Sequence, residues 1–513
     1  MRNIINWILF SFLTLSLLCC CGKNENPDNN GNNTIDAPSV ITAEPAEIAA
    51  EQTGGTFSVK LTSPARPKFG GIPSWITYKD GTFNPSAYTM TVTLTVSANG
   101  STSERSADLT VTAKGADAIV IKVTQPGKEE IKDPTLPDNA AISRTIELGL
   151  GWNMGNHFDA YYQGVSGETV WGNPKATQAT FDGVKAAGFT TVRIPVTWLG
   201  HIGDAPNYTI EKAWMDRVYE VVGYAENAGL NVILNTHHDE DHNEGHWQNL
   251  ANAVDSDAAN TQIKAEIAAV WGQIAERFKD KGDFLMLESF NELIYKTEWY
   301  SSSNTERRCN VINEWNQVFV DAVRATGANN ATRWLGVPGY AASPNFLQYL
   351  TVPDDPAKKT MLAFHCYDPY DYTIGDKQSP DWGHTGTCFP RGEEEIKTLF
   401  NSIYTNYIAK DIPIYMGEFG CSMRDKNNSK AWAYYLYYLE YVVKCAKTFG
   451  ISPILWDNGA KGSGKERHGY IDHGTGQYIG NSQQAVAAMV KAWKTDSEGY
   501  TLQTIYNSAP TNK

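Results

Sequence analysis

From residue 140 to the C-terminus, the chain repeats one pattern eight times: an apolar run followed by a stretch with helical spacing. The runs cover residues 148–155, 190–198, 231–238, 284–292, 333–340, 361–369, 413–420 and 452–459. Between them, apolar side chains recur every three or four residues, most clearly at Ile263, Ile267, Val270, Ile274 and Phe278. An open doubly wound sheet usually stops at five or six strands, whereas a TIM barrel has eight. We therefore predict a (β/α)8 TIM barrel, an α/β fold, over residues 140–513.

The region before the barrel has a different pattern of apolar and polar residues. Residues 41–126 contain short segments rich in Thr and Val that alternate with period two, at 56–62, 89–98, 106–114 and 118–125. Turn residues such as Asn99-Gly100 separate them, which predicts a small all-β sandwich domain of the immunoglobulin-like kind. Residues 127–139 contain prolines and are expected to form a semi-rigid linker, and residues 22–40, rich in Asn and Gly, a flexible tether.

Residues 1–21 are predicted to be a signal segment, with Arg2 ahead of the apolar run 8–18. Three cysteines, Cys19, Cys20 and Cys21, close this run. The segment resembles a bacterial lipoprotein signal, in which the new N-terminal Cys is acylated. Leu18 stands three residues before Cys21, so we expect Cys21 to be the lipid anchor, with Cys19 and Cys20 as alternatives. An ordinary cleaved signal is the competing interpretation. Acylation implies a lipid-anchored, surface-exposed protein of the cell outer membrane.

Composition narrows the class of partner. A net charge of −14 disfavours nucleic acid, because neutralising phosphates needs a basic surface. The 15 Trp and 26 Tyr suit a neutral sugar polymer, although most aromatic side chains are expected in the core. The five cysteines after the signal segment are too few and too widely spaced for a disulfide framework, and Cys366 with Cys388 is the candidate pair. We expect a monomer.

Polar and aromatic residues collect where the apolar runs end. In a TIM barrel the chemistry lies at the C-terminal ends of the strands, so these residues should share one site. They are Asn156, Arg193, His237, His238, Asn291, Glu292, His365, Tyr367, Glu418 and Trp456. Glu292 and Glu418 lie at the ends of two separate runs. Cleavage of a glycosidic bond requires two carboxyl groups, because one protonates the leaving oxygen while the other attacks or stabilises the sugar carbon. The pattern indicates a retaining, endo-acting glycoside hydrolase.

These residues also carry a family resemblance. TVRIPVTW with Arg193, ILNTHH with His237, Asn291-Glu292, His365-x-Tyr367, MGEFG with Glu418 and ILWDN with Trp456 resemble the active-site set of glycoside hydrolase family 5, the cellulase family. GWNMGN, ETVWGNP and NTHHD are similar to subfamily 4, which is rich in endoglucanases and xyloglucanases. The early TFSV strand, Pro73-Ser74-Trp75-Ile76 and Val123-Thr124-Gln125 make residues 41–126 resemble a BACON-type domain, and Trp75 is interpreted as a core residue rather than a sugar-binding platform.

The resemblance implies a role for each residue. Glu292 is the general acid and then the general base, which requires a raised pKa, and Glu418 is the ionised nucleophile. Arg193 is expected to lower the pKa of Glu418 and also to pair with Glu288. Asn291 would bind the sugar 2-hydroxyl. His365 would set the protonation of Glu292, and Tyr367 would set the position of Glu418. Trp456 would form the floor of the subsite beside the cleaved bond.

The substrate is less constrained. His238, Asn156, Trp171, Trp247 and Tyr370 are candidate substrate-binding residues. Trp299 and Tyr300, with the 367–392 loop that holds Trp382, suggest an open cleft for a polymer. The resemblance favours a plant cell-wall polysaccharide, with xyloglucan first and mixed-linkage β-glucan, cellulose or glucomannan as alternatives.

Two functions of other classes compete. His237, His238, Asp239, Asp241, His242 and His246 crowd together and could bind a metal ion that activates water. The other strand ends offer the paired glutamates instead of further ligands, so we expect no metal and no cofactor. A non-catalytic surface glycan-binding protein on a degenerate barrel is the second alternative. The presence of both Glu292 and Glu418 argues against it.

Overall fold

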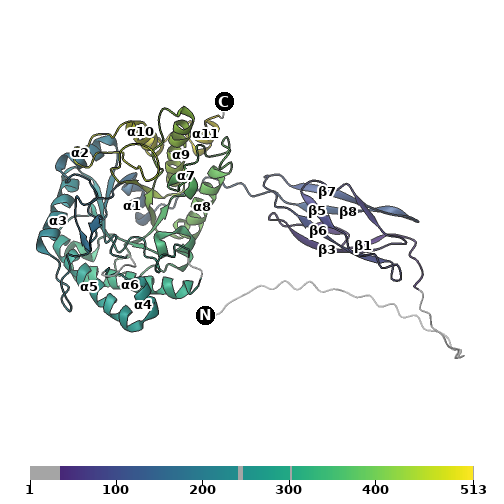
Figure 1. Ribbon diagram of the computed structural model, residues 1–513, viewed down its shortest axis with the longest axis horizontal. Coiled ribbons are helices and arrows are strands. Elements are labelled where there is room, and N and C mark those ends of the chain that lie inside the picture. The colour runs from purple at the N-terminus through teal and green to yellow at the C-terminus, as the bar shows by residue number, and fades with distance from the viewer. Residues whose placement is uncertain (1–34, 241–245, 301–302, 512–513) are drawn as a thin grey trace. The chain divides into compact units, whose positions relative to one another are not determined.

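The computed structural model describes residues 35–240, 246–300 and 303–511. The chain divides into two units, of which the first ends at Glu130 and the second begins at Ile131 (Figure 1). The division falls within the predicted 127–139 linker, and Ile131 and Leu136 pack against the core of the second unit. The predicted signal segment and its Cys21 lie outside the described residues.

The first unit is all-β, as predicted, and consists of two four-stranded sheets. One sheet has the order β1 (Thr42–Glu44), β3 (Gly55–Thr62), β6 (Thr89–Val96), β5 (Ile76–Lys79). The other has the order β2 (Glu47–Ala49), β8 (Ala116–Gln125), β7 (Arg105–Ala113), β4 (Lys68–Gly70). The long strands alternate, so that Val59, Leu61, Val92 and Leu94 are buried between polar neighbours.

Trp75 belongs to the core of this first unit. Its side chain is half-buried and packs against the apolar cluster between the sheets. The Arg105 guanidinium lies 4.4 Å from the centre of the Trp75 ring, in a cation–π contact. Because Arg105 covers one face and the core takes up much of the rest, the ring does not offer an open platform for a sugar.

The second unit is a closed eight-stranded parallel barrel, which confirms the predicted TIM barrel. Each apolar run supplies one strand, and Figure 1 shows the strands ringed by helices. The strands are β9 (Gly151–Met154), β12 (Thr191–Ile194), β13 (Asn231–Asn235), β14 (Leu285–Glu288), β15 (Leu335–Pro338), β16 (Thr360–Cys366), β17 (Ile414–Phe419) and β18 (Ser452–Asp457). β18 pairs with β9 and closes the ring.

The α-helices of this unit are α1 (Ala140–Leu148), α2 (Gln178–Ala187), α3 (Lys212–Asn227), α4 (Leu250–Asp255), α5 (Asp257–Phe278), α6 (Thr305–Ala325), α7 (Tyr370–Thr373), α8 (Gly392–Asn406), α9 (Ser429–Thr448), α10 (Ser482–Lys494) and α11 (Leu502–Asn507). Most of the helices lie between barrel strands in sequence, while α1 precedes β9, and α10 and α11 follow β18. Figure 1 shows helices such as α2, α3, α5 and α8 around the outside of the barrel. The apolar stripe predicted from Ile263 to Phe278 is the buried face of α5. Over the described residues, none of these helices has both the length and the apolar character needed to cross a membrane.

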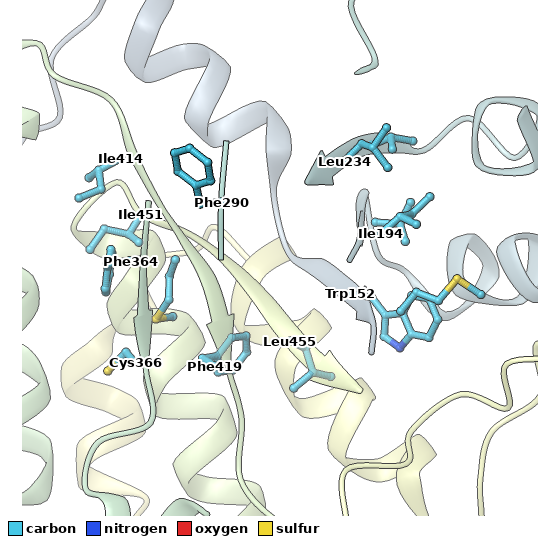
Figure 2. Close-up of a cluster of buried hydrophobic side chains, with 14 of the residues drawn as sticks. Trp152, Ile194, Leu234, Phe290, Phe364, Cys366, Ile414, Phe419, Ile451 and Leu455 are labelled. Carbon is cyan, nitrogen blue, oxygen red and sulfur yellow. The ribbon is translucent and has the colours of Figure 1, made fainter. Parts of the chain in front are cut away.

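Strand alternation separates the apolar core from the site. On β12, Ile194 belongs to the large apolar cluster between strands and helices, together with residues such as Trp152, Leu234 and Phe364, which Figure 2 shows. The side chain between Val192 and Ile194 is Arg193, which has the opposite parity and points into the barrel. The same alternation directs polar residues from other strands into the barrel mouth, where they can meet.

Candidate active site

Arg193 on β12 is the centre of a buried hydrogen-bond network in the barrel mouth. Its Nη1 donates to Glu418 Oε1 at 2.8 Å and to Asn153 Oδ1 at 3.0 Å. Its Nη2 donates to Glu288 Oε1 at 2.7 Å and to Asn291 Oδ1 at 2.9 Å. The guanidinium is fully buried, and such a charge is tolerated because carboxylates and amides surround it. Arg193 therefore holds residues from several strands in fixed relative positions, including both Glu288 and Glu418, as predicted from the sequence.

Glu418 lies near the end of β17, where the pairing with both neighbouring strands is irregular. Gly417 precedes it, and a Cβ atom at Gly417 would lie 3.1 Å from Nε2 of His365. Only a residue without a side chain lets His365 approach this closely. Tyr367 donates its hydroxyl hydrogen to Glu418 Oε2 at 2.8 Å. Glu418 is thus held at both oxygens, by Arg193 at Oε1 and by Tyr367 at Oε2.

Glu292 is in the loop that follows β14, since this strand ends at Glu288. His365 Nδ1 lies 2.7 Å from Glu292 Oε1 and 3.7 Å from Glu418 Oε2. One ligand atom from each of these three side chains lies within 4.8 Å of the others. Retaining glycosidases have carboxyl groups roughly 5 to 5.5 Å apart, whereas inverting enzymes need about 6.5 to 9.5 Å. The close approach of Glu292 and Glu418 fits the retaining geometry.

The electrostatics give the two carboxyl groups different environments. Burial raises the pKa of Glu292 to about 7, the charge of Glu240 adds to this effect, and His238 and Arg193 oppose it. Burial also raises the pKa of Glu418 above its ordinary value, while His365, Arg193 and the Tyr367 hydrogen bond oppose the rise. Arg193 therefore acts in the predicted direction, but desolvation is the larger effect. Burial lowers the pKa of His365 to about 4, so this imidazole is neutral at neutral pH.

Asn291, His237 and Trp456 line the same cleft as Glu292 and Glu418. Asn291 Oδ1 accepts from Arg193, which turns the Nδ2 donor of the amide away from the guanidinium. The rings of His237 and Trp456 are stacked, with centroids 5.9 Å apart and an angle of 7° between their planes. A Cβ atom at Gly155 would lie 2.6 Å from the Trp456 ring, so the absence of a side chain there makes room for the indole.

These residues line a cleft of about 820 Å³ at the barrel mouth. Trp299, Tyr300 and Tyr370 also line it and are exposed, and His238 lines it as well. Ala341, Ser343, Pro344 and Asn345 form a stretch of small and polar residues in its wall. A cleft lined by exposed aromatic side chains suits a polymer, because flat rings stack on the C–H faces of sugars.

The predicted substrate-binding residues fall into two groups. His238 and Tyr370 line the cleft. Asn156, Trp171 and Trp247 do not occur among the described residues that line it. Asn156 is held in a tight turn by hydrogen bonds to Asp159 and Asn173, Trp247 packs against the barrel core, and Trp171 touches His238, with ring centroids 5.6 Å apart. Their roles in substrate binding stay predictions.

Two buried carboxylates near His238 were not predicted from the sequence. His238 Nδ1 lies 3.5 Å from Glu240, and His238 Nε2 lies 3.9 Å from Asp159. Burial lowers the pKa of His238, but the hydrogen bond and charge of Glu240 and the charge of Asp159 outweigh it and raise the pKa to about 9. His238 is therefore a cation at neutral pH. The NTHHDE run contains Glu240, but only the fold reveals that Asp159 meets the same ring.

The second unpredicted group lies one layer deeper in the barrel. Tyr415 donates its hydroxyl hydrogen to Glu288 Oε2 at 2.5 Å, and Asn235 Nδ2 donates to Glu288 Oε1 at 2.9 Å. Strand parity could have indicated both, because Tyr415 and Asn235 alternate with core residues on β17 and β13. Glu466 and His468, which line the cleft, come from an irregular segment and carry no such signal.

The structure corrects the expectation for Trp382. This residue was expected to contribute to an open cleft, but its side chain is fully buried. It packs against Tyr372, Tyr437, Tyr438 and Tyr441 and so anchors the loop that follows β16. The candidate disulfide is not formed either, because Cys366 and Cys388 are free thiols, one buried and one exposed.

Two sets of side chains could each offer three metal-ligand atoms within 4.8 Å: Asp159, His237 and His238, and Glu292, His365 and Glu418. In the first set, Asp159 already accepts hydrogen bonds from the backbone amides of Asn156 and His157. In the second set, His365 is hydrogen-bonded to Glu292, and Tyr367 is hydrogen-bonded to Glu418. Asp241 and His242 of the sequence cluster lie outside the described residues, and the absence of a metal stays a prediction.

Comparison with known proteins places this geometry in a family. The cellulase model, glycosyl hydrolase family 5, matches residues 155–462, and the BACON model, an N-terminal binding domain, matches residues 70–126. A xyloglucan-specific endo-beta-1,4-glucanase of Bacteroides ovatus is 33% identical over 476 residues, which cover 87% of this chain and 90% of that protein.

Solved structures agree with these matches. A Bacteroidetes-affiliated GH5 cellulase linked with a polysaccharide utilization locus has a TM-score of 0.70 and 44% identity, over 73% of this chain and 98% of that one. A GH5-4 broad specificity endoglucanase from Bacteroides salanitronis has a TM-score of 0.67 and 43% identity, over 72% and 99% of the two chains. The resemblance inferred from the sequence is confirmed: the chain is a glycoside hydrolase that belongs to glycosyl hydrolase family 5, the cellulase family.

Proposed function

We propose that this enzyme is a retaining endo-β-1,4-glucanase that cleaves xyloglucan by double displacement. The observation that carries the proposal is the pairing of Glu292 and Glu418, whose nearest oxygens lie within 4.8 Å of each other and whose hydrogen-bond partners differ. Glu418 is bound by a permanent cation, Arg193, and by the Tyr367 hydroxyl, which suits a nucleophile that must be ionised. Glu292 is bound by the neutral His365 imidazole, which suits a group that gains and loses a proton.

In the first step, Glu292 donates its proton to the glycosidic oxygen while the bond between this oxygen and C1 breaks. A Glu418 oxygen attacks C1 from the opposite face and forms a glycosyl ester. In the second step, the Glu292 carboxylate takes a proton from water, whose oxygen bonds to C1 while the ester bond to Glu418 breaks. The pKa of about 7 lets Glu292 serve in both directions near neutral pH.

Two features support xyloglucan as the substrate. The xyloglucan-specific relative from Bacteroides ovatus resembles this chain over both units, and not only over the barrel. Ala341, Ser343, Pro344 and Asn345, which line the cleft, have small side chains, and small side chains in the lining suit a glucan that carries sugar branches. Linear glucans are the second candidate, because the solved relative from Bacteroides salanitronis is a broad specificity endoglucanase.

The cellular part of the proposal rests on the N-terminal sequence. We propose that Cys21 is acylated and that a monomeric enzyme is held at the outer membrane, facing the polysaccharide. Labelling cells with a radioactive fatty acid tests this, with Cys21→Ala as the variant and Cys20→Ala and Cys19→Ala as controls. Label that persists in Cys21→Ala would refute the assignment of the anchor.

The substrate is tested by reducing-end release from xyloglucan, mixed-linkage β-glucan, carboxymethyl cellulose and glucomannan. Wild type is compared with Glu418→Ala and Glu292→Gln, and with Glu276→Ala, a surface carboxylate on α5, as the matched control. We expect rapid cleavage of xyloglucan that both active-site variants lose and the control keeps. Preference for another glucan would refute the substrate alone. Binding without cleavage by wild type would support a glycan-binding protein and refute the proposed chemistry.

A further inference from the structure

Glu466 is a carboxylate in the lining of the cleft that the double-displacement chemistry does not use. It lies in the irregular segment between β18 and α10, and its side chain is exposed. Among the residues that the structure describes, none forms a hydrogen bond or an ion pair with the Glu466 carboxylate. On the outer surface such a group would simply be hydrated. In the lining of the cleft, its oxygens are available to accept hydrogen bonds from sugar hydroxyl groups.

Glu466 differs in this respect from the other carboxyl groups of the cleft. The described lining holds five carboxyl groups and neither a lysine nor an arginine. The other four each have a side chain as hydrogen-bond partner: Glu292, Glu298, Asp368 and Glu418. His238, the cation in the described lining, is already flanked by Asp159 and Glu240. The negative charge of Glu466 is therefore not cancelled by a neighbour in this lining.

The backbone that carries Glu466 is held in place. Asn458 Nδ2 donates to the Glu466 carbonyl at 3.0 Å, and Asn458 Oδ1 accepts from the backbone amide of His468 at 3.2 Å. Lys465 forms an ion pair with Asp376, so this neighbouring cation is engaged elsewhere. Glu466 itself has a φ of 54°, a left-handed conformation that a residue other than glycine keeps only where surrounding contacts hold it. A backbone held in this way lowers the entropy that is lost when a ligand binds.

The charge of Glu466 reaches the centre of the site. Burial raises the pKa of Tyr367 well above its ordinary value, and the charges of Glu418, Glu292 and Glu466 add to this effect. Tyr367 donates its hydroxyl hydrogen to Glu418, so a glucan bound for cleavage lies within range of the Glu466 charge. In water, two like charges about 6 Å apart weaken binding by about threefold. A negative substituent on the glucan should therefore be disfavoured here.

We propose that Glu466 is a specificity-determining residue, whose carboxylate accepts hydrogen bonds from hydroxyl groups of the glucan and repels glucans that carry negative substituents. This inference rests on the proposed function, because it concerns which β-1,4-glucans the cleft admits. Neutral sugar branches offer hydroxyl groups, which can donate to the carboxylate. Uronic acids and carboxymethyl groups meet a like charge instead. Glu466 takes no part in the proton transfers, so we expect its contribution in KM.

The test of the charge compares two forms of one polymer. Xyloglucan is used unmodified and after oxidation of a minority of its primary hydroxyl groups to carboxylates. Mixed-linkage β-glucan replaces it in both forms if the wild type prefers that polymer. Glu466→Gln removes the charge and keeps the size of the side chain and one acceptor oxygen. Glu276→Gln is the matched control, because Glu276 is a carboxylate on α5 that does not line the cleft.

We expect the ratio of kcat/KM on oxidised polymer to kcat/KM on unmodified polymer to rise by about threefold in Glu466→Gln and to keep its wild-type value in Glu276→Gln. The rise should occur at about 0.01 M salt, where the Debye length is about 30 Å, and disappear at about 1 M, where it is about 3 Å. A change in the shape of the cleft would not depend on salt in this way. Glu466→Ala removes both acceptor oxygens and should raise KM for unmodified polymer by about tenfold, with little change in kcat.

Three results would overturn the inference. A wild-type ratio in Glu466→Gln at low salt would mean that the carboxylate does not meet the polymer. A rise that persists at high salt, or that also occurs in Glu276→Gln, would mean that the effect is not the local charge of Glu466. A loss in Glu466→Ala that lies in kcat would mean that the segment supports the catalytic residues and does not bind the glucan. If the wild type cleaves neither unmodified polymer, the proposed function itself fails.

Discussion

Replacing Tyr367 by Phe removes one hydroxyl from the barrel mouth and leaves the ring in place. That hydroxyl donates to Glu418 Oε2 at 2.8 Å, while Arg193 still holds Oε1 at 2.8 Å. A hydrogen bond to a charged group contributes about 1.5 to 3 kcal/mol. The question is in which of the two chemical steps this energy is lost.

The answer follows from where the negative charge develops. In the first step the Glu418 carboxylate loses its charge as it attacks C1, so a hydrogen bond to it is weaker in the transition state than before. In the second step the carboxylate leaves and regains its charge, so the same hydrogen bond strengthens. Tyr367→Phe should therefore slow the second step by up to about 10-fold to 150-fold, the equivalent of the full hydrogen bond. The first step should be affected far less.

Stopped-flow measurement with 2,4-dinitrophenyl β-cellobioside separates the two steps. We expect a burst of dinitrophenol equal to the enzyme concentration, followed by slow turnover and a lowered KM, since the glycosyl-enzyme accumulates. Tyr415→Phe is the matched control: it removes a buried hydroxyl from the same strand as Glu418, but that hydroxyl bonds to Glu288. No burst in Tyr367→Phe, or the same burst in Tyr415→Phe, would refute the reasoning.

Three further predictions concern acid–base behaviour and stability. Because the first step needs protonated Glu292 and burial raises its pKa to about 7, kcat/KM should fall as pH rises through about 7, whereas a profile flat to pH 9 would contradict the assignment. Glu240→Gln removes a charge that raises this pKa, so the basic limb of the pH profile should move to lower pH; an unchanged limb would argue against the coupling. Trp382→Ala should lower the free energy of unfolding by about 3–5 kcal/mol, measured by urea denaturation, because the ring is fully buried, and a surface-like loss under 1 kcal/mol would contradict its anchoring role.

The barrel could be predicted from the sequence because each strand is buried on both faces and reads as an apolar run. The paired carboxylates could be predicted because both follow such runs directly. The outer strands of the two sheets in the first unit are β1, β2, β4 and β5, and each has only three or four residues. An alternating pattern does not appear over so few residues, so the sequence predicted a sandwich but not its edge strands.

The surroundings of the site were harder to predict. Asp159 and His238 are far apart in sequence, and only the closed ring of strands brings Asp159 within 3.9 Å of the imidazole. Trp382 looked like a cleft residue because it lies in a long polar loop, yet four tyrosines from α7 and α9 enclose it. Side chains in loops carry no periodicity, and their direction depends on packing that sequence alone does not encode.

The network around Arg193 has an evolutionary consequence. Its partners belong to different strands, so a change at any one position disturbs several others at once, and such coupled positions resist gradual replacement. Trp299 and Tyr300, by contrast, lie in a loop, and Tyr370 begins the short helix α7 outside the barrel strands, so these residues can change one at a time. Mutant libraries that aim at new polysaccharide substrates should therefore randomise residues outside the barrel strands. Among related enzymes with different substrate preferences, we expect substitutions to concentrate there, while the catalytic residues on the strands stay the same.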